Sequence, residues 1–176
     1  MTGAAVAVAV REMADADCAA VAAVRVAGWR FAYRGLLPDA YLDAMSVEAD
    51  TDARREHLAR AGDRTVHLVA EAGEEVVGWA AFGPGRDPGA GPGDAELYAL
   101  YVRPDAVGTG VGRALTGEVL ARAAGLGFGR LSLWVLEGNA RGRRFYAKAG
   151  FVPDGAREPW EVGGRTVMEL RYARAL

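Results

Sequence analysis

The sequence predicts an α/β (α+β) domain in which a mixed sheet is flanked by helices, and three observations lead to this fold class. Short apolar segments of strand length alternate with longer segments of helical periodicity. The segment Leu97–Leu115 joins an apolar strand to a helix through a loop rich in glycine. Leu131–Val135 is almost continuously apolar, as is typical of a strand buried on both faces. With 176 residues, of which 51% are hydrophobic, we expect a single domain over residues 1–176.

Periodicity, glycine and proline set the expected element boundaries. Alternating valines predict a first strand over Gly3–Val10, and Asp15 or Asp17 is placed to cap the helix that follows. That helix is expected to end at Gly35 and Pro38. The further predicted elements are a helix over Val47–Ala61, strands over Thr65–Glu71 and Glu75–Phe82, a mobile loop over Gly83–Gly93, a strand over Glu96–Val102, a helix from Val111 to about Gly125, a strand over Leu131–Val135, a helix over Asn139–Ala149, and strands over Phe151–Val152 and Thr166–Tyr172.

Composition excludes several classes of protein. Lysine and arginine number 21 against 23 acidic residues, so the chain offers no basic footprint for nucleic acid. Cys18 is the only cysteine, which excludes an internal disulfide and a cysteine-based zinc site, and His57 and His67 are too few for a convincing metal site. The apolar N-terminal run is too short to span a bilayer and has no basic leader. We therefore expect no metal, no membrane partner and a cytoplasmic location.

The glycine loop of Leu97–Leu115 predicts a site for a phosphate or pyrophosphate. Gly108, Gly110 and Gly112 allow backbone N–H groups to crowd together, and a helix N-terminus adds unpaired donors and partial positive charge. A P-loop would need a lysine after its last glycine, whereas Arg113 and Ala114 follow Gly112. A dinucleotide fingerprint would need a third glycine where Arg113 stands.

A second motif lies between Asn139 and Phe151. Asn139 and Tyr146 are seven residues apart, so both lie on one face of a helix, about two turns apart. Gly150 is placed to end the helix and turn the chain into the next strand. A phenol that faces a cleft can donate a proton to a leaving thiolate, and an asparagine at a helix start can bind ligand amides as well as cap the helix.

Together the two motifs resemble the GNAT superfamily of N-acetyltransferases. Val102-x-Pro104 followed by Gly110-Val-Gly112-Arg113 is similar to its acyl-CoA loop, and Asn139–Phe151 is similar to its pattern N-x-x-A-x-x-[F/L]-Y-x-x-x-G-F. The resemblance implies a mixed, mostly antiparallel sheet whose fourth and fifth strands splay apart, with acetyl-CoA as cosubstrate. It implies Tyr146 as general acid, and as cofactor-binding residues Leu100, Tyr101, Val102, Gly108, Thr109, Gly110, Val111, Gly112, Arg113 and Asn139. It is also compatible with a homodimer formed through the C-terminal strands.

The chain departs from the family pattern at three positions. The family usually has arginine or glutamine where Val107 stands, and often an aromatic residue where Ala106 stands. Gly142 replaces the usual alanine. Because most pyrophosphate contacts in this loop come from backbone N–H groups, we expect Val107 to weaken binding of CoA rather than abolish it.

An amine that arrives as an ammonium ion needs a base, and Glu96 is the candidate. Strict alternation puts Glu96 on the same strand face as Tyr98, Leu100 and Val102, with Asp94, Glu137 and Glu158 as weaker candidates. By resemblance the end of the first helix borders the acceptor pocket, so Trp29, Phe31 and Tyr33 are expected to line it. Trp134 is expected in the core, and Cys18, His57 and His67 are expected to have structural or solvent-facing roles.

These features favour an enzyme that transfers the acetyl group of acetyl-CoA directly to a primary amine, in particular a small-molecule amine. Two alternatives stay open at this point. One is a non-catalytic acyl-CoA-binding or interaction module on the same fold, and the other is an enzyme that acetylates protein N-termini or lysines. The acceptor depends on the first two helices and on the turn over Glu158–Arg165, which the sequence does not decode.

Overall fold

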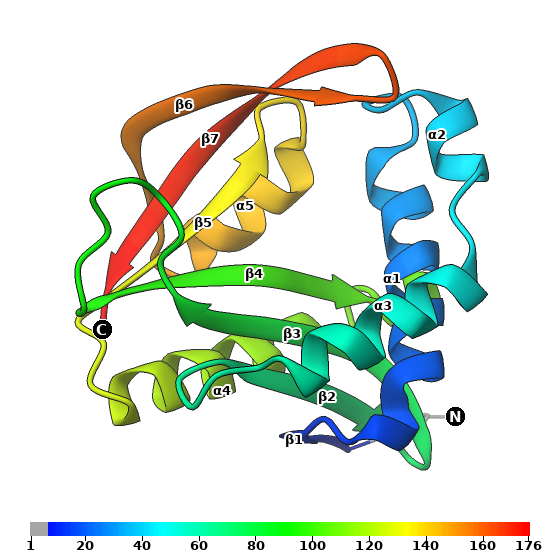
Figure 1. The fold of residues 1–176 in the computed structure, drawn as a ribbon, viewed down its shortest axis with the longest axis horizontal. Helices are drawn as coiled ribbons and strands as arrows, with labels where there is room; N and C mark the ends of the chain where they lie inside the picture. The colour runs from blue at the N-terminus through cyan, green and yellow to red at the C-terminus, as the bar shows by residue number, and fades with distance from the viewer. Residues whose placement is uncertain (1–6) are drawn as a thin grey trace, which may run out of the picture.

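The computed structural model describes residues 7–176 and contains one seven-stranded sheet with the strand order β1-β2-β3-β4-β5-β7-β6. Neighbouring strands are antiparallel except β4 and β5, which are parallel. The mixed, mostly antiparallel sheet predicted from the sequence is therefore confirmed (Figure 1). Its strands are β1 (Val8–Glu12), β2 (Val66–Ala72), β3 (Glu75–Pro84), β4 (Asp94–Val102), β5 (Arg130–Leu136), β6 (Val152–Val162) and β7 (Arg165–Ala175). The Gly3–Val6 part of the predicted first strand lies outside the described residues.

Helices cover both faces of this sheet (Figure 1). They are α1 (Cys18–Tyr33), α2 (Asp39–Asp43), α3 (Val47–Ala59), α4 (Val111–Gly125) and α5 (Ala140–Lys148). On one face α1 packs against β3 and β4 around buried Cys18, Val21 and Trp79. On the other face α4 packs against β3 around buried Val111 and Leu115.

A glycine in β3 allows the close approach of α4. A side chain on Gly78 would place its Cβ 2.7 Å from Val111 Cγ1 and 2.9 Å from Leu115 Cδ1. Both separations are shorter than packed carbon atoms tolerate. The loop before α4 and the helix itself are therefore held close to the sheet.

Strands β4 and β5 share only a short parallel ladder. Asp94 pairs with Arg130, Ala95 with Leu131 and Glu96 with Ser132, and the strands then separate (Figure 1). The splay that the family resemblance implied is confirmed. From Leu97 to Val102 the β5-facing edge of β4 has no partner strand among residues 7–176, while its other edge stays paired with β3.

A β-bulge in β4 corrects the predicted alternation of side chains. Ala81 pairs with Ala99 and Phe82 pairs with Leu97, so Tyr98 is an extra residue in β4. The bulge reverses the faces of the residues that follow it. Leu100 and Val102 pack toward the α4 side, whereas Tyr101 packs toward the α1 side. The expectation that Glu96 shares a face with Leu100 and Val102 is therefore wrong.

Four other local features differ from the predictions. Neither Asp15 nor Asp17 caps α1 through its side chain, because Asp17 accepts hydrogen bonds from Arg11 (2.8 and 2.9 Å) and from the Ala14 N–H (2.7 Å) instead. The additional helix α2 begins directly after Pro38. The predicted strand Phe151–Val152 is the long strand β6, and the expected turn over Glu158–Arg165 is a tight hairpin at Gly163 and Gly164.

Leu115→Ala should destabilise the protein by about 2–5 kcal/mol, because Leu115 is fully buried between α4 and β3 and its truncation leaves a cavity. Leu126→Ala is the matched control, since Leu126 is 37% exposed just after the same helix. We expect the control to cost about 1 kcal/mol or less. Urea unfolding of both variants measures this, and equal losses would contradict the packing described here.

Candidate active site

The loop before α4 presents a set of free backbone donors. Gly108 and Gly110 adopt positive φ angles of +84° and +99°, and a Cβ at either position would meet no atom within 4 Å. Among residues 7–176, no protein acceptor is recorded for the N–H groups of Gly108, Gly110, Val111, Gly112 and Arg113. They stand at the N-terminus of a 15-residue helix, where the macrodipole adds positive potential. The loop can therefore bind an anionic group.

A groove leads from this loop along the open edge of β4. It is a cavity of about 480 Å³ whose lining joins the end of α1, the second half of β4, the glycine loop and the start of α5. The predicted cofactor-binding residues in its lining are Leu100, Tyr101, Val102, Gly108, Gly110, Gly112, Arg113 and Asn139. Thr109 does not line it, because its hydroxyl donates to the Ala106 carbonyl oxygen, and Val111 is buried in the core.

Tyr146 stands where the groove meets the gap between the splayed strands. Its ring packs edge-on against Phe145 and Phe151, with centroid distances of 5.3 and 5.9 Å. It lines both the groove and a narrow passage that also touches Leu100 of β4 and Leu133 of β5. Burial, and to a lesser degree Tyr101, raises the pKa of the phenol well above its usual range. The phenol therefore stays protonated at neutral pH and is a hydrogen-bond donor.

Asn139 begins α5 and is coupled to Gly142. Its Oδ1 accepts a hydrogen bond from the Gly142 N–H at 2.9 Å, which caps the helix. A Cβ on Gly142 would lie 2.6 Å from Asn139 Nδ2. Glycine at position 142 thus explains one departure from the family pattern, since the usual alanine would displace the folded-back side chain of Asn139.

A second cavity of about 630 Å³ lies next to the passage beside Tyr146, on the α1 side of the sheet, and shares Tyr33, Tyr98 and Trp134 with it. Six aromatic residues line it, and among them Trp29 packs edge-on against Tyr33 at 5.0 Å and against Trp160 at 6.1 Å. The lining also contains two leucines, four carboxylates and one arginine. These charged residues are Arg86, Asp87, Glu96, Glu158 and Glu169.

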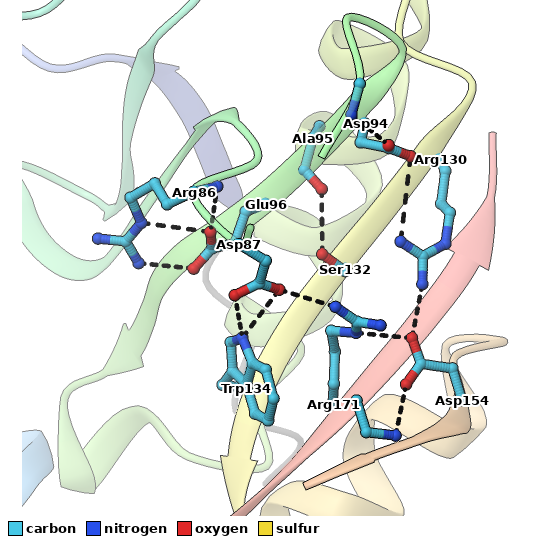
Figure 2. A network of polar contacts seen from close by, with 12 residues as sticks. Arg86, Asp87, Asp94, Ala95, Glu96, Arg130, Ser132, Trp134, Asp154 and Arg171 are labelled. Atoms are coloured by element: carbon cyan, nitrogen blue, oxygen red, sulfur yellow. Dashed lines mark hydrogen bonds and ion pairs between the residues drawn. The ribbon is translucent and has the colours of Figure 1, made fainter. Parts of the chain in front are cut away.

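The loop between β3 and β4 closes one side of this second cavity and is tied to three strands (Figure 2). Arg86 binds Glu96 of β4 through Nη2 at 2.6 Å, Nε at 3.2 Å and its backbone N–H at 3.0 Å. Asp87 accepts from Trp134 Nε1 of β5 at 3.1 Å and from Arg171 of β7 at 3.0 Å. These contacts tie Arg86 and Asp87, two residues of the loop predicted to be mobile, to β4, β5 and β7.

The structure places the expected acceptor-lining residues in two different cavities. Trp29 and Tyr33 line the second cavity, and Tyr33 also lines the groove. Phe31 is 49% exposed and lines the groove instead, where Arg141 lies 5.2 Å above its ring. Trp134 is not a core residue, because it is partly exposed and lines the second cavity.

Among the weaker candidate bases, only Glu158 lines the second cavity. Asp94 accepts from the Gly91 N–H at 2.8 Å, and Glu137 pairs with Arg157 at 3.3 Å. Glu96 is 4% exposed. It lines the second cavity and accepts a hydrogen bond from Arg86 Nη2.

Cys18 is fully buried, His67 stacks on Trp79 and His57 is exposed, so these three side chains have the structural or solvent-facing positions expected. Within residues 7–176, no cluster of three or more His, Cys, Asp and Glu side chains suits a metal ion. None of the helices there has the length and apolarity needed to cross a membrane.

Sequence reasoning missed Glu169 and Trp160, which line the second cavity from β7 and β6. In the sequence, Glu169 is an acidic residue between the apolar residues Met168 and Leu170. A single charge in an otherwise apolar strand could have marked it as a candidate site residue. Trp160 had no comparable signal, because the length of β6 was not predicted.

Fold and site together define a class of protein: a mixed α/β domain with an opened sheet, an anion-binding helix start on one side and an aromatic, acidic cavity on the other. Comparison with known proteins agrees with this class. Residues 29–151 match the model of the acetyltransferase (GNAT) family. The uncharacterized N-acetyltransferase YuaI of Bacillus subtilis is 31% identical over 132 residues, which cover 75% of this chain and 73% of YuaI.

Two further proteins are similar over a short segment or in fold. The mycothiol acetyltransferase of Beutenbergia cavernae is 45% identical over 58 residues, covering 33% of this chain and 20% of that protein. The crystal structure of the PaiA N-acetyltransferase from Thermoplasma acidophilum in complex with coenzyme A has a TM-score of 0.71 at 21% identity, covering 93% of this chain and 98% of that one. The chain belongs to the GNAT acetyltransferase family, whose members are acetyl-CoA-dependent acyltransferases, and it is an enzyme of that class.

Gly142→Ala should destabilise the protein by about 1 kcal/mol, because the new Cβ displaces Asn139 from its capping position. Gly117→Ala is the matched control, since Gly117 is exposed inside α4 and a Cβ there meets nothing within 4 Å. The control should gain up to about 1 kcal/mol from better helix propensity. Thermal unfolding compares the two, and a stabilising Gly142→Ala would show that Asn139 does not cap α5.

Proposed function

We propose that this protein transfers the acetyl group of acetyl-CoA to a small primary amine. The observation that carries the proposal is that the groove, the passage beside Tyr146 and the aromatic cavity are neighbours that share lining residues. Tyr33, Tyr101 and Tyr146 contribute to the passage and to one or both of the cavities that it joins. An acyl donor and an acceptor that enter from opposite faces of the sheet meet at this passage.

The groove suits acetyl-CoA in charge and in shape. The free N–H groups from Gly108 to Arg113 offer donors to a pyrophosphate, and the unpaired edge of β4 from Leu97 to Val102 can pair with the amides of a pantetheine arm. Arg113 and Arg141 add positive charge to the lining. Val107 lines the groove without adding a charged contact.

The passage suits direct transfer between donor and acceptor. The hydroxyl of Tyr146, kept protonated by its surroundings, donates to the sulfur that leaves the acetyl group. A carboxylate of the aromatic cavity takes the proton of the acceptor ammonium. Glu96 is the candidate predicted from the sequence, and it lines that cavity.

A small acceptor fits better than an exposed protein segment. The loop that carries Arg86 and Asp87 forms one wall of the cavity, and Trp29 and Trp160 form another. Acidic side chains favour a positively charged amine. One relative, the enzyme from Beutenbergia cavernae, is named for mycothiol rather than for a protein acceptor.

The direct test mixes the protein with acetyl-CoA and a panel of amines and peptides, and measures free thiol together with the acetylated product. We expect thiol release with small cationic amines and little with peptides. Acetylation of peptides alone would assign the protein to protein acetylation, and CoA binding without thiol release across the panel would overturn the proposed function.

Tyr146→Phe should lower kcat by about 10²–10⁴-fold, because the variant keeps the ring but loses the donor at the passage. The KM for acetyl-CoA should change far less, since the groove and the glycine loop are intact. Steady-state kinetics with product confirmed by mass spectrometry measure both constants. An unchanged kcat would remove Tyr146 from the role of general acid.

A further inference from the structure

Two carboxylates of the aromatic cavity differ sharply in how they are bound. Glu96 accepts three hydrogen bonds from Arg86, one on Oε1 and two on Oε2. A carboxylate has about four acceptor positions, so Glu96 has roughly one left. The side chain is also only 4% exposed, so the Arg86 contacts leave little of the carboxylate open to a ligand in the cavity. Most acceptor positions of the Glu96 carboxylate are therefore taken by Arg86.

Glu169 has no arginine partner comparable to Arg86 among residues 7–176. Its side chain lines the same cavity and is half-buried, and no hydrogen bond or ion pair to it is recorded among residues 7–176. In the ladder of β6 and β7 it stands directly opposite Glu158, and a like charge directly across a strand pair is unfavourable. Burial first, and then Glu158 and Glu96, raise the pKa of Glu169 above the usual value for a glutamate.

We propose that Glu169, and not Glu96, is the general base that deprotonates the acceptor amine. This inference rests on the proposed acetyl transfer. One N–H bond of the ammonium breaks and its proton goes to the Glu169 carboxylate, directly or through one water. The freed electron pair forms the C–N bond to the acetyl carbon as the C–S bond breaks. The sulfur takes the proton of Tyr146, and the second proton lost by the nitrogen restores the phenol.

The groups that face Glu169 come from every element around it. Glu158 faces it from β6, Glu96 and Tyr101 from β4, and Tyr33 from α1. On its own strand Arg171 is two residues away, but Asp87 and Asp154 hold that guanidinium at 3.0 and 2.7 Å. The nearest arginines are thus committed to other carboxylates, and the surroundings of Glu169 are acidic or aromatic.

This arrangement gives Glu96 a different task. Its pair with Arg86 fixes the loop that forms one wall of the cavity, next to the contact of Asp87 with Trp134 (Figure 2). Glu96 therefore acts as a positioning residue through Arg86, while Glu169 contacts the reacting amine.

The test compares kcat/KM as a function of pH for wild type, Glu169→Gln and Glu96→Gln, with an amine found in the acceptor panel. In the wild type we expect activity to fall as pH falls through the pKa of Glu169, above the ordinary glutamate value of about 4.3. Glu169→Gln should no longer show this fall of activity at acid pH, which is called the acidic limb of the pH profile. Its kcat should be lower by about 10²-fold or more. Glu96→Gln should keep the limb. Loss of the limb in Glu96→Gln but not in Glu169→Gln would overturn the proposal.

Glu158→Gln gives a second test, in which the pH at which activity falls is measured. This pH should change only if Glu169 acts as the base and not if its role is structural. Removing the opposite negative charge stabilises ionised Glu169, so the fall of activity at acid pH should move to lower pH. A limb that stays in place contradicts the proposal, even if Glu169→Gln does not fold.

NMR titration of ¹³C-labelled glutamate side chains needs no acceptor. The Glu169 midpoint should lie above that of an ordinary glutamate and fall in Glu158→Gln, and an ordinary midpoint in the wild type would overturn the assignment. Since this measurement is independent of turnover, it separates a failure of Glu169 as base from a failure of the proposed function, which the acceptor panel reports.

Discussion

The site depends on one interruption of β-sheet hydrogen bonding. The parallel ladder of β4 and β5 stops at Glu96 and Ser132, and the extra residue Tyr98 enters β4 directly after it. A bulge bends and twists the strand that carries it. The same residue thus accompanies the separation of β4 from β5 and reverses the faces of the side chains that follow. The end of the β4–β5 ladder leaves the free strand edge, and the bulge next to it puts Leu100 on the groove side and Glu96 on the side of the aromatic cavity.

Charge distribution completes what the opened sheet begins. On the α4 side the site is built from backbone donors, a helix N-terminus and arginines, which suit phosphate groups. On the α1 side it is built from aromatic rings and carboxylates, which suit a cation. Among the carboxylates that line this second side, Arg86 and Arg171 neutralise only Glu96 and Asp87 (Figure 2), so Glu158 and Glu169 are left as lining carboxylates with no recorded arginine partner among residues 7–176. In the proposed reaction, an anionic donor and a cationic acceptor therefore approach from opposite sides of the sheet.

Much of this architecture could be predicted from the sequence, and the failures have identifiable causes. Gly108, Gly110, Asn139 and Tyr146 belong to local motifs whose spacing fixes their geometry, so their positions follow without tertiary information. The face of Glu96 could not be predicted, because a bulge depends on the register between two strands rather than on either strand alone.

Long-range contacts account for the other failures. The loop between β3 and β4 depends on ion pairs from Arg86 to Glu96, 10 residues away, and from Asp87 to Arg171, 84 residues away. Glu169 lies in the second cavity because β6 and β7 form a long hairpin. The short apolar segments in the sequence did not predict the length of this hairpin. Local spacing predicted the residues that line the groove, whereas the lining of the second cavity depends on pairings between distant segments.

The most direct test of this account is amide hydrogen exchange by NMR, with and without CoA. The account predicts that CoA protects two separate groups of amides: those of Gly108 to Arg113 in the loop, and those of Leu97 to Val102 that are not bonded to β3. The amides of β1, on the far edge of the sheet, serve as the internal control. Protection of the loop without protection of β4 would contradict the claim that the opened strand edge is what binds the acyl carrier.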